Sequence, residues 1–329
     1  MKILVIGPLD ADSFADNVQN ALTRLGHEVR TTGPARPRFR NRRLSNAVAV
    51  LGERLTAQDA MLQKHLVRAS EEFRPDVVLT MDRTVQKPVL SQLTRHGARS
   101  ALWFPDAVSN MGRHDLFLAG YDRIFLKNPT LVRQLSVLQG LPVSYLPEAG
   151  NPAWHVPQGE YGTREVIVLA GNVHPTRAVL LDRLVRAGLP LEIYGPSLAS
   201  WLDFPALRSV HQGRSVTRLE KSAVFRSARV VLNNLHPAEF SGVNCRVFEA
   251  AGAGSAILTE ERAGFADAFR IGEELFTFET FEELVDLAGE LLRDPEKGRP
   301  VADAAAIRAA RDHTYDGRLV QLLDELWSV

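Results

Sequence analysis

Residues 230–259, VVLNNLHPAEFSGVNCRVFEAAGAGSAILT, contain the pattern that decides the fold. An apolar strand is expected at 230–232, a polar loop follows it, and a short helix begins near Asn244. Small residues end this helix before a second apolar strand at 256–258. Two buried strands joined through a helix form the repeating unit of a parallel sheet, so this stretch predicts an α/β fold.

The start of the short helix is expected to face the carboxyl end of the first strand. Free backbone N–H groups and the positive end of the helix dipole favour an anion there, and a phosphate is the natural ligand. Arg246 lies in the first turn, and Glu249 lies one turn further along among apolar neighbours. A shielded carboxylate needs a partner. The paired hydroxyls of a ribose could supply it, and so could an ion pair with Arg246 at the i,i+3 spacing.

The same alternation of strands and helices extends over the rest of the chain. Expected strands lie at 2–6, 27–31, 76–80, 99–104, 123–126, 143–145, 165–169, 191–194 and 229–232. A stretch rich in proline and glycine, 147–162, has no periodicity and predicts a linker. We therefore predict two Rossmann-like α/β/α domains, 1–150 and 164–312, joined by residues 151–163. Ligands of such sheets bind beyond the carboxyl ends of the strands, so the expected site is a cleft between the domains.

Composition excludes several classes of protein. The 329 residues carry 39 basic and 39 acidic side chains, so a nucleic-acid partner is not expected. The single cysteine excludes an intramolecular disulfide and is consistent with a reducing, cytoplasmic location. No apolar run approaches the ~20 residues that cross a bilayer, so no transmembrane segment is expected. The basic run 36–43 is interpreted as a loop that helps bind an anionic or membrane-associated acceptor, with nucleic acid or anionic lipid as alternatives.

Three loops in the second half follow strands and contain residues that let the backbone approach a ligand. They hold Gly171, Asn172, Gly195, Ser241, Gly242 and Asn244. Arg177, near the start of the helix after Gly171, could donate to a diphosphate or could be an ordinary surface arginine. His236 and His174 each follow a strand, and either could donate to a phosphate. These loops predict a phosphate-binding edge of the second sheet.

Other chemistries lack their signatures. There is no P-loop, and the glycines of a dinucleotide fingerprint are missing after the first strand, which weighs against a nicotinamide or flavin cofactor. The histidines lack ligand spacing, so no metal site is predicted. Asp106 and Asp82 each follow a strand of the first half. We predict that Asp106 is a general base or binds a hydroxyl, and that Asp82 caps the next helix.

Several motifs together resemble one family. They are VLAGN (168–172) with Arg177, LEIYG (191–195), NCRVFEA (244–250), HTYDGR (313–318), WFPD (103–106) and YLP (145–147). With them the chain resembles the CgeB-type, spore-maturation glycosyltransferases of the GT-B fold, which are related to glycosyl transferases of group 1. The resemblance covers nearly the whole chain and is strongest after residue 164. Its motifs are specific to the family and do not identify a substrate.

The resemblance implies transfer of a sugar, as by a hexosyltransferase, from a nucleotide diphosphate donor held by the second domain. Glu249 matches the later glutamate of a two-glutamate motif and is implied to contact the donor ribose. Ser241 stands where the earlier glutamate is expected, so neither a retaining nor an inverting outcome follows. The resemblance also implies no metal and no cofactor besides the donor substrate. Residues 313–329 are implied to form a helix that crosses back to the first domain.

The leading hypothesis is therefore a metal-independent glycosyltransferase in which positive groups such as Arg177 and Arg246 stabilise the leaving diphosphate. Its acceptor, on the Asp106 side, could be a small molecule, a glycan, a lipid-linked molecule or a protein. An epimerase of nucleotide sugars on the same fold is one alternative, and it would act without an acceptor. The other alternative is a binding or assembly protein without turnover, and the serine at 241 in place of the expected glutamate supports it.

Overall fold

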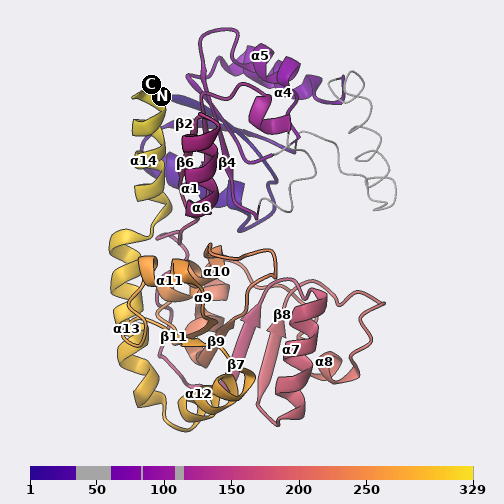
Figure 1. Ribbon diagram of the computed structural model, residues 1–329, viewed down its shortest axis with the longest axis vertical. Coiled ribbons are helices and arrows are strands. Elements are labelled where there is room, and N and C mark those ends of the chain that lie inside the picture. The colour runs from indigo at the N-terminus through magenta and orange to yellow at the C-terminus, as the bar shows by residue number, and fades with distance from the viewer. Residues whose placement is uncertain (35–60, 83, 108–114, 329) are drawn as a thin grey trace. The chain divides into compact units, whose positions relative to one another are not determined.

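The computed structural model describes residues 1–34, 61–82, 84–107 and 115–328 (Figure 1). The basic run 36–43 lies outside the described residues. The chain forms two compact units. Unit 1 comprises Met1–Pro147 together with Asp316–Val329, and unit 2 comprises Glu148–Tyr315. Residues from both ends of the sequence therefore build the same unit.

Unit 1 contains a parallel sheet of six strands in the order β2-β1-β3-β4-β5-β6. The strands are β1(Lys2–Ile6), β2(Glu28–Thr32), β3(Val77–Thr80), β4(Arg99–Phe104), β5(Arg123–Leu126) and β6(Val143–Tyr145). The helices described are α1(Phe14–Arg24), α4(Lys64–Phe73), α5(Lys87–Leu93), the 3₁₀ turn η2(Asp115–Leu118), α6(Pro129–Arg133), the π-helical turn η3(Gln134–Leu138) and α14(Tyr315–Trp327). Alternating buried side chains on the strands supply a core on each face of this sheet.

Helices cover both faces of the unit 1 sheet. Side chains such as Leu4 and Ile6 pack against α4 and α5 on one face. Helix α1 begins after Ser13, whose hydroxyl accepts from the Asp16 N–H at 3.2 Å and caps the first turn. Helix α14 is attached to this unit through Asp316, which pairs with Arg24 at 2.6 Å.

Unit 2 contains a parallel sheet of five strands in the order β11-β10-β9-β7-β8. The strands are β7(Arg164–Ala170), β8(Leu191–Tyr194), β9(Ala228–Asn233), β10(Ile257–Glu260) and β11(Phe276–Phe278). The helices described are α7(Pro175–Arg186), α8(Pro205–Val210), α9(Arg218–Ser227), α10(Cys245–Gly252), α11(Ala263–Ala268), α12(Phe281–Arg293) and α13(Pro295–Asp312). The segment from β9 through α10 to β10 is the strand–helix–strand repeat that residues 230–259 predict.

Strand β7 shows how the unit 2 core divides. Val166, Val168 and Ala170 join a core that includes side chains of α9, α10, α11 and α13. The intervening Ile167 and Leu169 join a core that includes side chains of α7, α8 and α12. The sheet is therefore covered on both faces, which is why its strands are nearly continuous apolar runs.

Some elements differ from the prediction. Strand β11 and helices α8 and α11 were not expected, because each is too short to show a clear period. Helix α13 begins at Pro295 and continues through Pro300. The buried alanine stripe beyond Pro300 compensates for the hydrogen bond that a proline cannot donate. Within the described ranges, no helix is both long and apolar enough to cross a membrane.

Candidate functional site

Two glycine loops meet at the carboxyl edge of the unit 2 sheet. Gly171 follows β7, and its N–H donates to the carbonyl of Tyr194 at the end of β8 over 2.7 Å. A Cβ on Gly195 would collide with the Gly171 carbonyl, so the two loops touch through their backbones. Gly171 itself has φ +133°, a conformation that side chains strongly disfavour. Both positions therefore require glycine.

The guanidinium of Arg246 lies directly against Gly171. A Cβ on that glycine would overlap the Arg246 Nη2 atom. Arg246 is half-buried in the first turn of α10. Across the described parts of the chain, its guanidinium has no hydrogen bond or ion pair with a protein acceptor. A partly shielded cation without an anionic partner is what a site for an anionic ligand requires.

Replacing Gly171 with alanine tests this arrangement. The added Cβ would displace the Arg246 guanidinium and strain the backbone, so we expect Gly171→Ala to weaken diphosphate binding about 10-fold or more. Titration calorimetry with inorganic pyrophosphate measures this loss. Gly188→Ala is the control, because Gly188 also has a positive φ but has open space around its Cα. Equal losses in the two variants would contradict the role given to the Gly171–Arg246 contact.

Arg177 holds the loops around this cation together. Its side chain is buried, which excludes the interpretation as a surface arginine. Its guanidinium donates from Nη1 to the Asn172 carbonyl at 2.6 Å, and from Nε and Nη2 to the Asn234 side chain and carbonyl. Burial, with Arg246 as the next cause, lowers the pKa of Arg177 to about 9. Two guanidinium groups thus face the same region, and an anion between them would relieve their repulsion.

Two histidines border the same region. The Nδ1 atom of His174 accepts from the Arg177 N–H at 3.3 Å, and Nδ1 of His236 accepts from the Ala238 N–H at 3.2 Å. Each acceptor role leaves the ring proton on Nε2. The two rings meet edge to face with centroids 4.8 Å apart. Both imidazoles are therefore oriented as N–H donors, as a phosphate site needs.

The pKa of His174 is lowered to about 4, first by burial and then by Arg177, His236 and Arg246. In the unfolded chain the imidazole returns to its ordinary pKa of about 6.5, so below that pH the unfolded state binds the extra proton. We expect the stability that depends on neutral His174 to be lost as the pH falls from 6.5 to 4. His174→Gln should flatten this part of the melting-temperature profile, whereas His65→Gln, at an exposed position of unit 1, should not. Identical profiles for wild type and His174→Gln would contradict the assignment.

Asn244 precedes α10 as its N-cap, but its side chain does not cap the helix. Instead, its amide exchanges hydrogen bonds of 2.9 and 3.0 Å with Asn233 at the end of β9, and Asn233 also donates to Thr259 at 3.1 Å. The first N–H groups of α10 are thus left without the side-chain acceptor that usually satisfies them. They are oriented towards the same edge of the sheet as Gly171.

The loop before α10 is fixed through its backbone. A Cβ on Gly264 would overlap the Ser241 carbonyl, so the loop packs closely against α11. Gly242 is buried within this loop, and Ser241 is half-buried. No carboxylate stands at residue 241, as the sequence already indicates.

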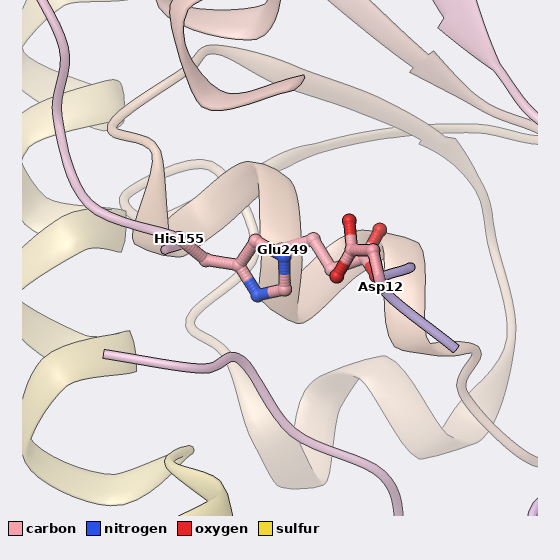
Figure 2. Close-up of side chains that lie close together, drawn as sticks. All are labelled: Asp12, His155 and Glu249. Carbon is pink, nitrogen blue, oxygen red and sulfur yellow. The ribbon is translucent and has the colours of Figure 1, made fainter. Parts of the chain in front are cut away.

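Glu249 is paired, but its partner is Lys221 rather than Arg246. Lys221 Nζ lies 2.8 Å from Glu249 Oε1, and both side chains are buried. The predicted alternative of an Arg246–Glu249 ion pair is therefore wrong. A lysine on the neighbouring helix α9 reaches the carboxylate while Arg246 lies against Gly171. A ring nitrogen of His155 lies within 4.8 Å of a Glu249 oxygen, and Figure 2 shows the imidazole beside the carboxylate.

The sequence missed Lys221 for a clear reason. Lys221 lies in the first turn of α9, which spans Arg218–Ser227. Nothing in the local pattern indicates that this lysine pairs with a carboxylate on another helix. Asn234 was likewise missed, because a single asparagine after a strand usually belongs to a turn.

The two aspartates predicted in unit 1 have different surroundings. Asp82 Oδ1 accepts from the N–H and the hydroxyl of Thr84 at 2.8 and 2.6 Å. It therefore stabilises a turn, and the prediction that it caps the next helix is wrong, because α5 begins after Gln86. Asp106, at the end of β4, is exposed and accepts from the Ala107 N–H at 3.0 Å.

A pocket lies beside Gly195 in unit 2. Its lining residues are Ser197, Leu198, Ala199, Ser200, Arg208, His211 and Gly213. His211 Nδ1 accepts from the Gly213 N–H at 3.0 Å, so the ring proton is on Nε2, which is buried and has no hydrogen-bond partner in the described structure. The lining of this pocket thus includes the hydrogen-bond donors Arg208 and His211 and no aspartate or glutamate.

Comparison with protein families gives one match in the second half of the chain. Residues 177–324 match the model of the family described as Glycosyl transferase-like. This range begins at Arg177 and includes the α10 segment. No curated protein matches the chain significantly in sequence.

Solved structures share the fold over the whole chain. Sucrose-phosphate synthase from Thermosynechococcus elongatus superposes with a TM-score of 0.67 at 13% identity, covering 100% of this chain and 99% of the other. HepE from Anabaena, solved with UDP-glucose, gives 0.67 at 12% identity with 100% of both chains covered. A glycosyltransferase from Rickettsia africae gives 0.62 at 11% identity, covering 99% and 98%. The chain therefore has the GT-B fold, and the predicted fold class is confirmed.

Proposed function

We propose that the chain is a glycosyltransferase that takes a sugar from a nucleotide diphosphate sugar. The observation that carries the proposal is the guanidinium of Arg246, which lies against Gly171 in the first turn of α10 and has no partner among the residues that the structure describes. Arg177 adds a second positive charge beside it. The match of residues 177–324 to the Glycosyl transferase-like family supports this function. So does the shared fold with HepE, which was solved with UDP-glucose.

Each part of the donor has a proposed place in unit 2. The diphosphate binds between the N-terminus of α10, the Gly171 loop and Arg246, with His236 as a further donor. The ribose lies against Glu249, one helical turn beyond the diphosphate. The proposed place of the base is the pocket whose lining includes Arg208 and His211, and these two side chains are the proposed donors to its carbonyl groups. Asp106 in unit 1 stays a predicted group for the acceptor hydroxyl.

The chemistry proposed for this site is charge stabilisation of the leaving group. When the bond between the sugar and the diphosphate breaks, negative charge grows on the leaving phosphate oxygen. Arg246 and the α10 N–H groups are in place before the reaction and stabilise that charge without reorganisation. The protein supplies these positive groups itself, so we propose a reaction that needs no metal. Ser241 offers no carboxylate, and the stereochemical outcome is left open.

A thermal-shift panel tests the donor site. We expect UDP, GDP or TDP, or one of their sugars, to raise the melting temperature by roughly 5–10 °C at about 100 times the Kd, because a ligand of the native state stabilises it. Glu249→Ala should reduce the shift given by nucleotides, whereas Glu282→Ala, at an exposed position of α12, should not. An absence of any shift would refute the donor site.

Turnover is tested separately from binding. With a bound nucleotide sugar and an extract of candidate acceptors, a transferase releases the nucleoside diphosphate only when an acceptor is present. Ser241 favours one competing function, a nucleotide-sugar-binding protein without turnover. Binding without release of the nucleoside diphosphate, across small-molecule, glycan, lipid-linked and protein acceptors, would favour that alternative.

A further inference from the structure

The Lys221–Glu249 ion pair is unusual for its burial. The side chains of Lys221 and Glu249 are 9% and 10% exposed, whereas most ion pairs of unit 2 lie on the surface. Two buried charges give up hydration, and a pair of apolar residues of similar size often stabilises a fold as well or better. Stability alone therefore does not account for placing a lysine and a glutamate together here.

The position of Glu249 connects the pair with the anion site. Glu249 is three positions after Arg246 on α10, the i,i+3 spacing that places two residues on the same side of a helix. Arg246 is in the first turn, against Gly171, and Glu249 is about one turn further along, roughly 5 Å along the axis. A ligand whose diphosphate binds at Arg246 would bring its next group, the ribose, towards Glu249.

Lys221 makes its closest approach to one of the two carboxylate oxygens. Its ammonium group is 2.8 Å from Oε1. Among the described residues, Oε2 accepts no hydrogen bond from the protein. An ionised carboxylate accepts hydrogen bonds but donates none, so Oε2 suits a ligand that brings hydroxyl donors.

We infer that Lys221 is a positioning residue for the ribose of the donor, an inference that rests on the proposed function. By binding Oε1, the lysine fixes the rotamer of Glu249 and directs Oε2 to the ribose hydroxyls. Its charge also balances the carboxylate, so that covering Glu249 with a ligand does not bury a lone negative charge. Lys221 itself does not touch the ligand.

This role has a measurable consequence for selectivity. A buried carboxylate that is held ready for a hydroxyl rejects an analogue that lacks the hydroxyl, because its oxygen is then left without a donor. The wild-type protein should bind UDP about 10-fold or more tightly than 2′-deoxy-UDP, and GDP more tightly than 2′-deoxy-GDP. Inorganic pyrophosphate has no ribose, so its affinity should not depend on the Lys221–Glu249 pair.

The test uses titration calorimetry with UDP, GDP, their 2′-deoxy forms and pyrophosphate on the full chain. We expect Lys221→Met to weaken binding of the ribonucleotide about 10-fold and to bring the ribose-to-deoxyribose ratio close to one, while pyrophosphate affinity changes less than about 2-fold. Lys221→Arg keeps the charge and should restore part of the ratio. Lys297→Met, which breaks the exposed Lys297–Glu290 pair of the same unit, is the matched control and should change nothing.

The outcomes separate the two proposals. A folded Lys221→Met protein that keeps the wild-type ratio would overturn the positioning role. So would a wild-type protein that binds UDP and 2′-deoxy-UDP equally while still binding pyrophosphate. If neither pyrophosphate nor any nucleotide binds the wild type, the proposed donor site itself is wrong, and the role of Lys221 falls with it.

A second variant guards against misfolding of Lys221→Met, which leaves Glu249 buried without its counter-ion. The double variant Lys221→Met/Glu249→Gln replaces both charges with neutral groups of similar size, and it should fold. We expect it to bind pyrophosphate like the wild type and to lose the ribose preference. Retention of that preference in the double variant would overturn the inference.

Discussion

Arg246→Met should weaken binding of pyrophosphate and of UDP-glucose at least 100-fold while leaving the fold intact. The expected loss of about 3 kcal/mol matches the removal of a preorganised charged donor from a shielded anion site. Because Arg246 has no protein partner in the described structure and lowers the pKa of Arg177, its removal leaves no group unsatisfied and relieves a repulsion. The melting temperature of the free protein should therefore stay the same or rise.

Calorimetric titration and thermal unfolding together check this result. Arg186→Met serves as the control, because Arg186 is an exposed arginine of α7 that pairs with Asp182. It removes the same charge from the same unit without touching the Gly171 loop. Pyrophosphate affinity that falls equally in both variants would reduce Arg246 to a contributor of general charge, contrary to the proposed site.

Arg177→Met, unlike Arg246→Met, should lower the stability of the free protein. It removes a buried guanidinium that donates to Asn172 and to two acceptors of Asn234, and each acceptor left unsatisfied costs about 1–3 kcal/mol. We expect the free energy of unfolding of unit 2 to fall by roughly 3–5 kcal/mol and its melting temperature to fall by about 10 °C. Ligand affinity should fall too, because the loops that carry Asn172 and Asn234 are no longer held.

Two measurements check this effect. Urea unfolding gives the loss of stability, and hydrogen exchange of the amides of unit 2 shows that the loss lies in that unit. Saturating pyrophosphate should recover only part of the lost stability, since the loops need the guanidinium before the ligand can bind them well. A variant as stable as the wild type that has lost only ligand binding would show that Arg177 acts on the ligand and not on the loops. The two arginines would then share one role, and the division between them would be wrong.

The sequence predicted the fold well where one segment determines its own structure. Strands β1, β4, β5, β6 and β8 were predicted with the bounds that the structure has, and helix α14 lies within the predicted range 313–329. A run of apolar residues between polar turns is sufficient for a buried parallel strand. The three residues of β11 carry too little pattern to be recognised, and they are identified as a strand by their parallel pairing with β10.

The candidate site divides in a similar way. Gly171, Asn244 and Arg246 could be proposed from sequence because strand ends and helix starts place them. The partner of Glu249 could not, since Lys221 belongs to α9, which precedes β9 in the sequence, and no local spacing connects it with α10. The buried position of Arg177 was also hidden, because its acceptor Asn234 follows a different strand.

The composition of unit 1 from two distant segments has a consequence for the order of folding during synthesis. Strands β1 to β6 are synthesised before unit 2, but helix α14, with Leu319, Leu322 and Leu326 fully buried, is synthesised after it. All of unit 2 is synthesised in between and can fold as a continuous unit before unit 1 is complete. Unit 2 can therefore be complete before unit 1, whose strands lack the buried leucine side chains of α14 until that helix has been synthesised.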